Sequence, residues 1–377
     1  MIKRKIKELI TASLFKNKVV IVYGARQVGK TTLVKDILKD FSKDGKYISC
    51  ELLSAQRGLS VLEPEQIKAF LGQYKLIVLD EAQDITNIGK VLKVIVDFLP
   101  DIQIIATGSS SFDLSNKISE ALTGRNITFQ LPALSLQEIV NDSDAIDVNS
   151  KLELLLRFGL YPEIYTLPDE ESKIARLNEI ANNYLYKDVL EFDKIRHSDT
   201  ISKLVQLLAL QIGQEVSLQE LATQLGINRL TVEKYIDLLE KSFVIFKLKS
   251  FSKNKRKEIS KNFKVYFYDL GIRNSIIQNF NQLDLRQDTG AIWENFCILE
   301  RKKYLLQVAP YRQTYFYRTY SGEEVDYIEE ISGKITAYEF KWNDKKNIKK
   351  LLTFTKTYNT QINKITPMNY FDFLNKS

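Results

Sequence analysis

The chain has 377 residues, of which 44% are hydrophobic and 27% are charged, with a formal net charge of +7. That length exceeds what one hydrophobic core usually supports, so two or three domains are expected, and no apolar run approaches the roughly 20 residues that cross a bilayer. One histidine and two cysteines exclude zinc or iron sites built from clustered histidines, so metal chemistry must use carboxylates, which suit Mg²⁺.

The two cysteines and the N-terminal segment indicate the cellular compartment in which the protein is expected. Cys50 and Cys297 lie far apart in apolar contexts, as expected of buried thiols in a reducing environment. Residues 1–5 are basic, but no apolar core follows them, so a signal peptide is not expected. We therefore expect a cytoplasmic protein without a membrane partner.

A complete phosphate-binding loop follows the first predicted strand. Residues 24–31 match GxxxxGK[ST], after the apolar run 19–22 and before a helical stretch. The glycines of such a loop let successive backbone N–H groups face phosphate oxygens at the positive end of a helix. We expect Lys30 to reach the β- and γ-phosphates of ATP and Thr31 to offer its hydroxyl to Mg²⁺. The predicted nucleotide-binding residues are Gly24, Ala25, Arg26, Gln27, Val28, Gly29, Lys30, Thr31, Thr32, Asp80 and Thr107.

Two further strands end in polar residues. The aliphatic run 76–79 is typical of a parallel strand buried on both faces, and it ends in Asp80 and Glu81. We expect Asp80 to hold Mg²⁺ and Glu81 to orient the attacking water, which indicates hydrolysis. Thr107, after the run 103–106, either senses the γ-phosphate or is a satisfied hydroxyl at a strand end. An α/β fold with a parallel sheet is predicted, with strands at 18–23, 46–50, 75–80, 102–107 and 126–131.

The stretch from 136 to about 240 is rich in helices. Ser217 and Glu220 form a capping-box pattern before one amphipathic helix, and a turn at 226–228 precedes another. A strand follows at 243–248. This order is that of a winged helix, which either meets a DNA groove or docks a protein. Its third helix would present Asn228, Arg229, Thr231, Glu233 and Lys234.

A cluster of basic residues favours DNA as the partner of this segment. Eight basic side chains and one acid lie between residues 247 and 264. Such a cluster is expected where a protein contacts a phosphate backbone, although a solvated loop gives the same pattern. The eight are Lys247, Lys249, Lys253, Lys255, Arg256, Lys257, Lys261 and Lys264.

The last hundred residues return to mixed α/β character. In the last of three predicted strands, Glu339 and Lys341 face away from the aromatic residues, and Asp326 on the neighbouring strand can lie beside Glu339. These carboxylates can bind Mg²⁺ together with Glu294, and Lys341 can activate a hydrolytic water. A solvated strand face with a Glu–Lys pair produces the same short pattern. The predicted strands and helix lie at 264–269, 291–300, 315–319, 323–330 and 335–342.

Together these motifs resemble the bacterial and archaeal AAA-type ATPases that carry a C-terminal domain of unknown function. The resemblance covers nearly the whole chain, with Leu160 standing where a second glycine is usual. It implies an additional-strand P-loop core, a winged-helix middle and a C-terminal domain similar to PD-(D/E)XK nucleases. Besides the P-loop, the matching segments are 79–83, 107–110, 122–125, 131–135, 159–163, 268–271, 292–295, 323–326 and 338–341.

The resemblance also implies roles for two arginines. Arg125 becomes the candidate arginine finger, acting in cis or on a neighbouring subunit of an oligomer, and its alternative is a structural ion pair. Arg26 contacts either a nucleotide or a neighbour. The domains implied are a P-loop AAA-type ATPase core, a helical lid, a winged helix and a nuclease-like domain, at 1–135, 136–198, 199–262 and 263–377.

The function expected is a Mg²⁺-dependent ATPase that binds DNA and couples its nucleotide state to the nuclease-like module. The catalytic residues of that module would be Asp326, Glu339 and Lys341. Two alternatives stay open: a nucleotide-switched scaffold for protein partners, and a regulatory DNA-binding protein whose C-terminal domain is inactive.

Overall fold

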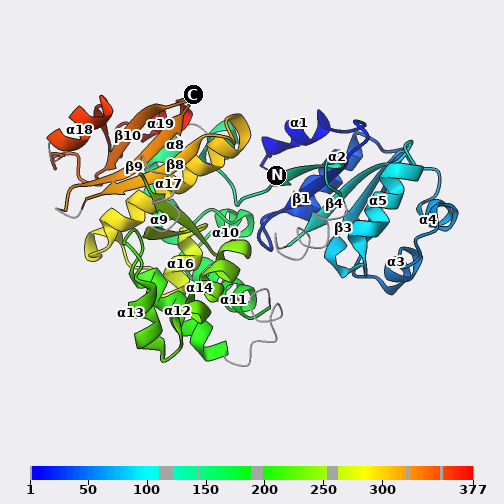
Figure 1. Cartoon of the computed structure of the whole chain (residues 1–377), viewed down its shortest axis with the longest axis horizontal. Helices are drawn as coiled ribbons and strands as arrows, with labels where there is room; N and C mark the ends of the chain where they lie inside the picture. The colour runs from blue at the N-terminus through cyan, green and yellow to red at the C-terminus, as the bar shows by residue number, and fades with distance from the viewer. Residues whose placement is uncertain are drawn as a thin grey trace. The chain divides into compact units, whose positions relative to one another are not determined.

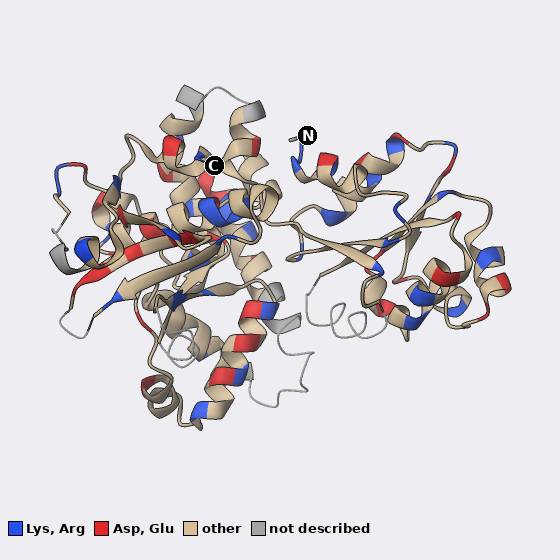
Figure 2. Ribbon diagram, turned by 45° about the horizontal axis from the view of Figure 1, so that its top comes forward, with Lys and Arg blue, Asp and Glu red and all other residues tan. Residues whose placement is uncertain are grey.

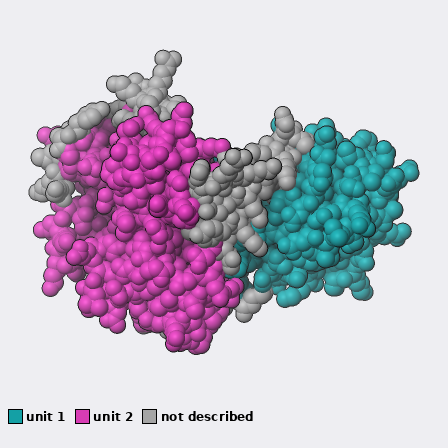
Figure 3. Space-filling model, turned by 90° about the horizontal axis from the view of Figure 1, so that it is seen from below, with its two compact units in different colours: residues 1–134, 241–243 teal, residues 135–240, 244–377 magenta. Residues whose placement is uncertain are grey.

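The computed structural model describes residues 2–109, 122–142, 145–187, 198–252, 262–319, 322–348 and 351–376. The chain divides into two compact units (Figure 3). Unit 1 comprises residues 1–134 and 241–243, and unit 2 comprises residues 135–240 and 244–377. Among the described residues, no helix is both long and apolar enough to span a membrane.

Unit 1 is built on a five-stranded parallel sheet in the order β2-β3-β4-β1-β5 (Figure 1). The predicted parallel α/β sheet is therefore confirmed, and each strand differs from its predicted bounds by no more than one residue. β4 lies between β1 and β3, as expected of an additional-strand core. The strands are β1 (Val19–Tyr23), β2 (Gly45–Ser49), β3 (Leu76–Asp80), β4 (Gln103–Gly108) and β5 (Asn126–Gln130).

The core of unit 1 follows from aliphatic runs and helical spacing. Every residue of β3 and β4 is buried, because both strands are central in the sheet. In the helix α5, Ile88, Val91, Leu92 and Ile95 are buried at a helical spacing and join the same cluster. The helices are α1 (Ile6–Thr11), α2 (Lys30–Lys39), α3 (Leu53–Gly58), α4 (Pro64–Leu71), the 3₁₀ turn η1 (Ala82–Asp84) and α5 (Ile88–Phe98).

Unit 2 contains the helix-rich stretch. The Ser217 hydroxyl accepts a hydrogen bond from the backbone N–H of Glu220, at 3.3 Å, and caps α13 as the sequence indicated. The helices before the second sheet are α7 (Leu136–Asp142), α8 (Ala145–Ser150), α9 (Leu152–Phe158), α10 (Pro162–Thr166), α11 (Glu170–Lys187), α12 (Ser198–Leu210), α13 (Leu218–Leu225) and α14 (Arg229–Lys241). Later come α16 (Leu270–Ile276), η3 (Leu283–Leu285), α17 (Thr289–Val308), α18 (Leu352–Tyr358) and α19 (Tyr370–Asn375).

A six-stranded mixed sheet in the order β11-β10-β9-β8-β6-β7 completes unit 2. β6 and β7, which include the strand expected in the wing, pair with each other, and β6 also pairs with β8. The boundary predicted at 262/263 therefore falls inside one sheet, between two strands that pair. The strands are β6 (Ile245–Ser250), β7 (Phe263–Phe267), β8 (Gln313–Arg318), β9 (Glu324–Ile331), β10 (Lys334–Phe340) and β11 (Ile362–Ile365).

Two segments that carry the family resemblance pack against each other. The carboxylate of Asp269 accepts hydrogen bonds from the backbone N–H groups of Leu160, at 2.7 Å, and Ile272, at 3.1 Å. Burial raises the pKa of Asp269 to about 6. A Cβ on Gly271 would lie 2.1 Å from the carbonyl oxygen of Phe158. These residues thus join α9 to α16 and have a structural role.

The variant Gly271→Ala is expected to destabilise the protein, because its methyl group would overlap the Phe158 carbonyl. We expect the free energy of unfolding to fall by about 1–3 kcal/mol, the usual cost of overpacking. Gly290→Ala in α17 is the matched control, since nothing lies within 4 Å of its Cβ. Chemical denaturation measures both variants, and equal stabilities would contradict this packing.

Candidate functional site

The predicted phosphate-binding loop connects the end of β1 to the start of α2. Gln27 and Gly29 have φ values of +62° and +94°, in the left-handed region that a loop of consecutive N–H groups requires. Gly24 has no room for a side chain, since a Cβ would lie 2.1 Å from the carbonyl oxygen of Leu131. Lys30 is buried and donates hydrogen bonds to the carbonyl oxygens of Gly24, at 3.1 Å, and Ala25, at 3.0 Å. Its ammonium group therefore lies inside the loop.

Asp80 lies beside the start of α2. Its Oδ2 accepts a hydrogen bond from the Thr31 hydroxyl at 2.7 Å, and its Oδ1 accepts one from the Thr107 hydroxyl at 2.5 Å. Thr107 also accepts the backbone N–H of Glu81, at 3.0 Å, so its hydroxyl is satisfied at the strand end. The Oε1 of Glu81 is 3.8 Å from the Nζ of Lys30. Adjacent hydroxyl and carboxylate oxygens are the hard donors that Mg²⁺ prefers, so these residues fit a magnesium nucleotide.

A third hydroxyl reaches Asp80 from a residue that the sequence did not single out. The Tyr47 hydroxyl, on β2, donates to Oδ2 of Asp80 at 2.6 Å. Burial and this hydrogen bond raise the pKa of Tyr47, so it remains a donor. The Nζ of Lys35 lies 4.6 Å from the centre of the tyrosine ring. No motif marks Tyr47, because its contact depends on the pairing of β2 with β3.

The N-terminal segment also contacts the loop. The guanidinium of Arg4 donates to the carbonyl oxygens of Val28, at 2.7 Å, and Pro132, at 2.6 Å. Arg4 thereby connects the phosphate-binding loop to the segment after β5. Of the other predicted loop residues, Arg26 is half-buried and Thr32 is exposed.

Arg125 lies at the opposite end of the sheet from the loop. Its carbonyl accepts the N–H of Val19, the first residue of β1, whereas the loop follows the last. Five residues of β1 separate the two ends by roughly 16 Å. The Nε of Arg125 is 2.7 Å from Oδ1 of Asp97, which is the structural ion pair weighed as its alternative. The geometry thus supports the structural ion pair, and a role as arginine finger stays a prediction.

The residues predicted for the C-terminal site gather around Asp326 on β9. Burial first, and then the nearby carboxylates of Glu294 and Glu339, raise the pKa of Asp326 well above its usual range. Oδ2 of Asp326 accepts the backbone N–H of Phe340 at 2.8 Å, and Lys341 Nζ is 2.6 Å from Oε1 of Glu339. In the part of the chain that the structure describes, no group of three metal-ligating side chains is placed to hold an ion. Each of the three carboxylates also has a partner within the protein: Glu294 pairs with Lys264, Asp326 with the backbone of β10, and Glu339 with Lys341.

Two unpredicted members of this cluster come from β7. The Nζ of Lys264 lies 2.6 Å from Oε1 of Glu324 and 3.1 Å from Oε1 of Glu294. The Tyr266 hydroxyl donates to the same oxygen of Glu294 at 2.6 Å. Residues Lys264, Tyr266, Glu294, Glu324, Asp326, Glu339 and Lys341 are called the carboxylate cluster.

The expected basic surface is only partly available. Lys264 is buried in the carboxylate cluster, and the Nζ of Lys247 is 2.5 Å from Asp237 and 3.0 Å from Glu240. Lys264 is therefore too deeply buried to contact a phosphate backbone, Lys247 is half-buried beside two acids, and Lys249 is exposed. Acidic and basic residues are interspersed along the ribbon of both units (Figure 2). The other five members lie outside the described residues: Lys253, Lys255, Arg256, Lys257 and Lys261.

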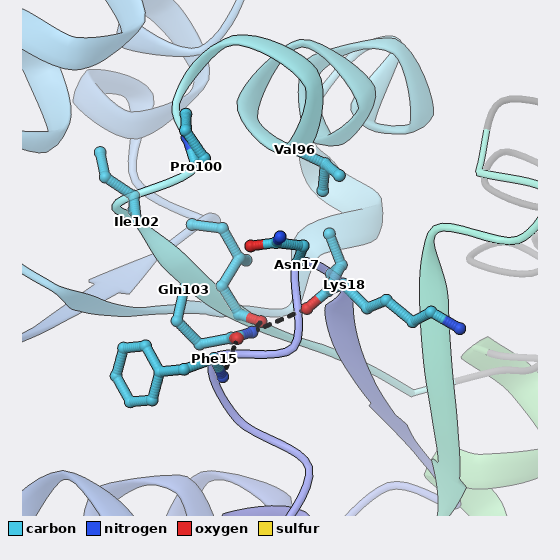
Figure 4. A pocket seen from close by; sticks show the side chains of 9 residues that line it. Phe15, Asn17, Lys18, Val96, Pro100, Ile102 and Gln103 are labelled. Atoms are coloured by element: carbon cyan, nitrogen blue, oxygen red, sulfur yellow. Dashed lines mark hydrogen bonds between the residues drawn. The ribbon is translucent and has the colours of Figure 1, made fainter.

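A small pocket of about 50 Å³ lies at the amino ends of β1 and β4 (Figure 4). The side chain of Gln103 closes it by accepting the N–H of Phe15, at 2.6 Å, and donating to the carbonyl of Lys18, at 2.9 Å. These two hydrogen bonds connect the segment before β1 to the start of β4, at the end of the sheet opposite the phosphate-binding loop.

Three successive segments of the chain match models of known protein families. Residues 16–140 match an AAA domain, residues 149–283 a domain of unknown function (DUF8612), and residues 289–368 another (DUF4143). An uncharacterized protein of Mycobacterium tuberculosis is 30% identical over 333 residues, covering 87% of this chain and 71% of that protein. An uncharacterized protein of Methanocaldococcus jannaschii is 29% identical over 342 residues, covering 85% of this chain and 74% of that protein.

Solved structures show weaker similarity. The Walker-type ATPase of Pyrococcus abyssi is 16% identical with a TM-score of 0.49, covering 74% of this chain and 96% of its own. The RuvB Holliday junction branch migration motor of Thermotoga maritima is 16% identical with a TM-score of 0.32, covering 68% and 93%. At these TM-scores the two structures support no argument about function.

Proposed function

We propose a function on the premise that the chain belongs to the family of these mycobacterial and Methanocaldococcus proteins and has an AAA-type P-loop ATPase fold. It is a Mg²⁺-dependent ATPase whose nucleotide state controls unit 2. The observation that carries this proposal is the position of Asp80, within hydrogen-bond distance of the Thr31 hydroxyl at the end of the phosphate-binding loop.

Each residue around the loop has a role that its position supports. Lys30 exchanges the carbonyl oxygens of Gly24 and Ala25 for the β- and γ-phosphate oxygens of ATP. Thr31 and Asp80 hold Mg²⁺, which neutralises charge on the phosphates when it is bound. Glu81 accepts a hydrogen bond from Gln83 at 2.7 Å and orients the attacking water.

Arg125 keeps a catalytic role only toward another copy of the chain. Its distance from its own loop leaves the nucleotide of a neighbouring subunit as the target of its guanidinium. The ion pair with Asp97 would have to open first. This role of Arg125 therefore requires an oligomer, whereas the roles proposed for Lys30, Thr31, Asp80 and Glu81 do not.

Lys30→Ala should abolish ATP hydrolysis, because the loop then has no cation for the γ-phosphate. We expect turnover to fall by at least about 100-fold, as when an electrostatic transition-state contact is removed. Lys39→Ala, an exposed lysine on the same helix, is the matched control and should keep wild-type turnover. Phosphate release from ATP with Mg²⁺ measures both, and wild-type turnover in Lys30→Ala would overturn the assignment.

DNA binding by unit 2 is the second part of the proposal. The order α13, turn, α14 supports it, since Asn228, Arg229, Glu233 and Lys234 are exposed along the second helix. The exposed Lys249 adds one more basic residue. In this view residues 199–262 act as the winged helix, and their strand β6 also belongs to the larger sheet.

The double variant Arg229→Ala/Lys234→Ala should bind duplex DNA more weakly, because two phosphate contacts are lost. The slope of log affinity against log salt should become shallower by about 2. Lys16→Ala/Lys43→Ala removes two exposed charges from unit 1 and serves as the control. Fluorescence anisotropy at several salt concentrations measures the slopes; equal slopes for the two variants would contradict DNA contact through α14.

The nuclease-like module of the proposal would use Asp326, Glu339 and Lys341, with Glu294 as a further ligand. Their gathering on one helix and two neighbouring strands supports the resemblance to nucleases. One observation favours the alternative of an inactive, binding module: Lys264 and Lys341 already neutralise carboxylates of the cluster.

A further inference from the structure

Lys264 is the most enclosed cation of the carboxylate cluster. Its side chain is 1% exposed, and its Nζ contacts the carboxylates of both Glu294 and Glu324. The ammonium group is therefore enclosed between two carboxylates, one on α17 and one on β9.

The three carboxylates expected to bind a metal are each committed to a partner in the protein. Glu294 accepts from Lys264 and from the hydroxyl of Tyr266, at 2.6 Å. Asp326 accepts from the backbone of β10, and Glu339 is paired with Lys341. A divalent cation that entered the cluster would compete with these donors for the carboxylates, and its charge would repel the enclosed ammonium of Lys264.

We propose that Lys264 is the resident cation of the carboxylate cluster and takes the place that a divalent metal holds in a nuclease. The cluster is then a closed ion network, and unit 2 binds its partners without cleaving DNA. This inference rests on the proposed nuclease-like fold of unit 2 and not on ATP hydrolysis by unit 1.

The contacts around Lys264 indicate that this ion network has a structural role. The segment between α12 and α13 pairs with β7 through its backbone. The N–H of Gly213 donates to the carbonyl oxygen of Val265 at 3.2 Å, and the backbones of Glu215 and Lys264 form an isolated antiparallel β-bridge. Arg318 on β8 lies 3.5 Å from Glu215 and 3.9 Å from Glu324. The ion network therefore fastens the helix–turn–helix region to the sheet.

The first test titrates the nucleotide-free, full-length wild-type protein with Mn²⁺ and follows the free ion by electron paramagnetic resonance. We expect no bound Mn²⁺ that depends on the cluster, so that wild type and Glu339→Gln give the same titration. A wild-type site with a dissociation constant below about 100 µM that is lost in Glu339→Gln would overturn the proposal. Because nucleotide is absent, this result is independent of ATPase activity.

The second test removes the resident cation. Lys264→Met leaves Glu294 and Glu324 without their ammonium partner, so it should lower Tm, and 1 mM Mn²⁺ should restore part of the loss. Lys249→Met, an exposed lysine on the adjacent strand, should show neither effect. If Lys264→Met responds to Mn²⁺ no more than wild type does, the proposal is wrong.

Should Lys264→Met fail to fold, the triple variant Lys264→Met/Glu294→Gln/Glu324→Gln decides the question, because it removes Lys264 together with both carboxylates that it contacts. Removing all partners of a buried ion pair is tolerated far better than removing one. The proposal predicts that the triple variant folds. A triple variant that fails to fold as Lys264→Met does would show that unpaired carboxylates are not the cause, and would overturn the proposal.

Discussion

The nucleotide site depends on one carboxylate that receives three hydroxyl groups. Asp80 ends β3, and the hydroxyls come from Thr31 on α2, Tyr47 on β2 and Thr107 on β4. Since β2 and β4 flank β3 in the sheet, this carboxylate connects the two neighbouring strands to the helix that follows the phosphate-binding loop. The loop and the acidic strand end are therefore held in fixed register before any nucleotide binds.

The two acidic sites differ in the kind of partner that surrounds them. The three hydrogen bonds described above bring neutral hydroxyl groups to Asp80, and such oxygen atoms suit Mg²⁺. Asp326 accepts the backbone N–H of Phe340, and the nearby lysines Lys264 and Lys341 pair with the neighbouring carboxylates of Glu294, Glu324 and Glu339. The same residue type thus lies among hydroxyl groups in unit 1 and among other charged side chains in unit 2.

Much of unit 1 was predictable because its signals are local. The strand 76–80 is a continuous aliphatic run that ends in an acid, and the loop motif fixes glycines and a lysine at set spacings. Tyr47 was missed because its role depends on which strand lies beside β3. The position of Arg125 could not be predicted for the same reason, because sequence cannot show that it precedes β5 at the end of the sheet away from the loop.

Unit 2 was less predictable, since its contacts join residues far apart in the chain. The strand after α14 carries a local wing pattern, yet it pairs with β8, some 65 residues later. Lys264 was counted with a basic cluster by its sequence neighbours, whereas β7 places it against Glu294 and Glu324. A lysine that belongs to a buried ion network and one that contacts phosphate look alike in sequence.

The most direct test of this account is ATP turnover as a function of Mg²⁺ concentration in wild type and in Asp80→Asn. The substitution keeps the size of the side chain but removes the charge on which the site depends. We expect Mg²⁺-dependent turnover in wild type and a loss of at least about 10- to 100-fold in the variant. Turnover and Mg²⁺ dependence that match wild type in Asp80→Asn would contradict the central claim.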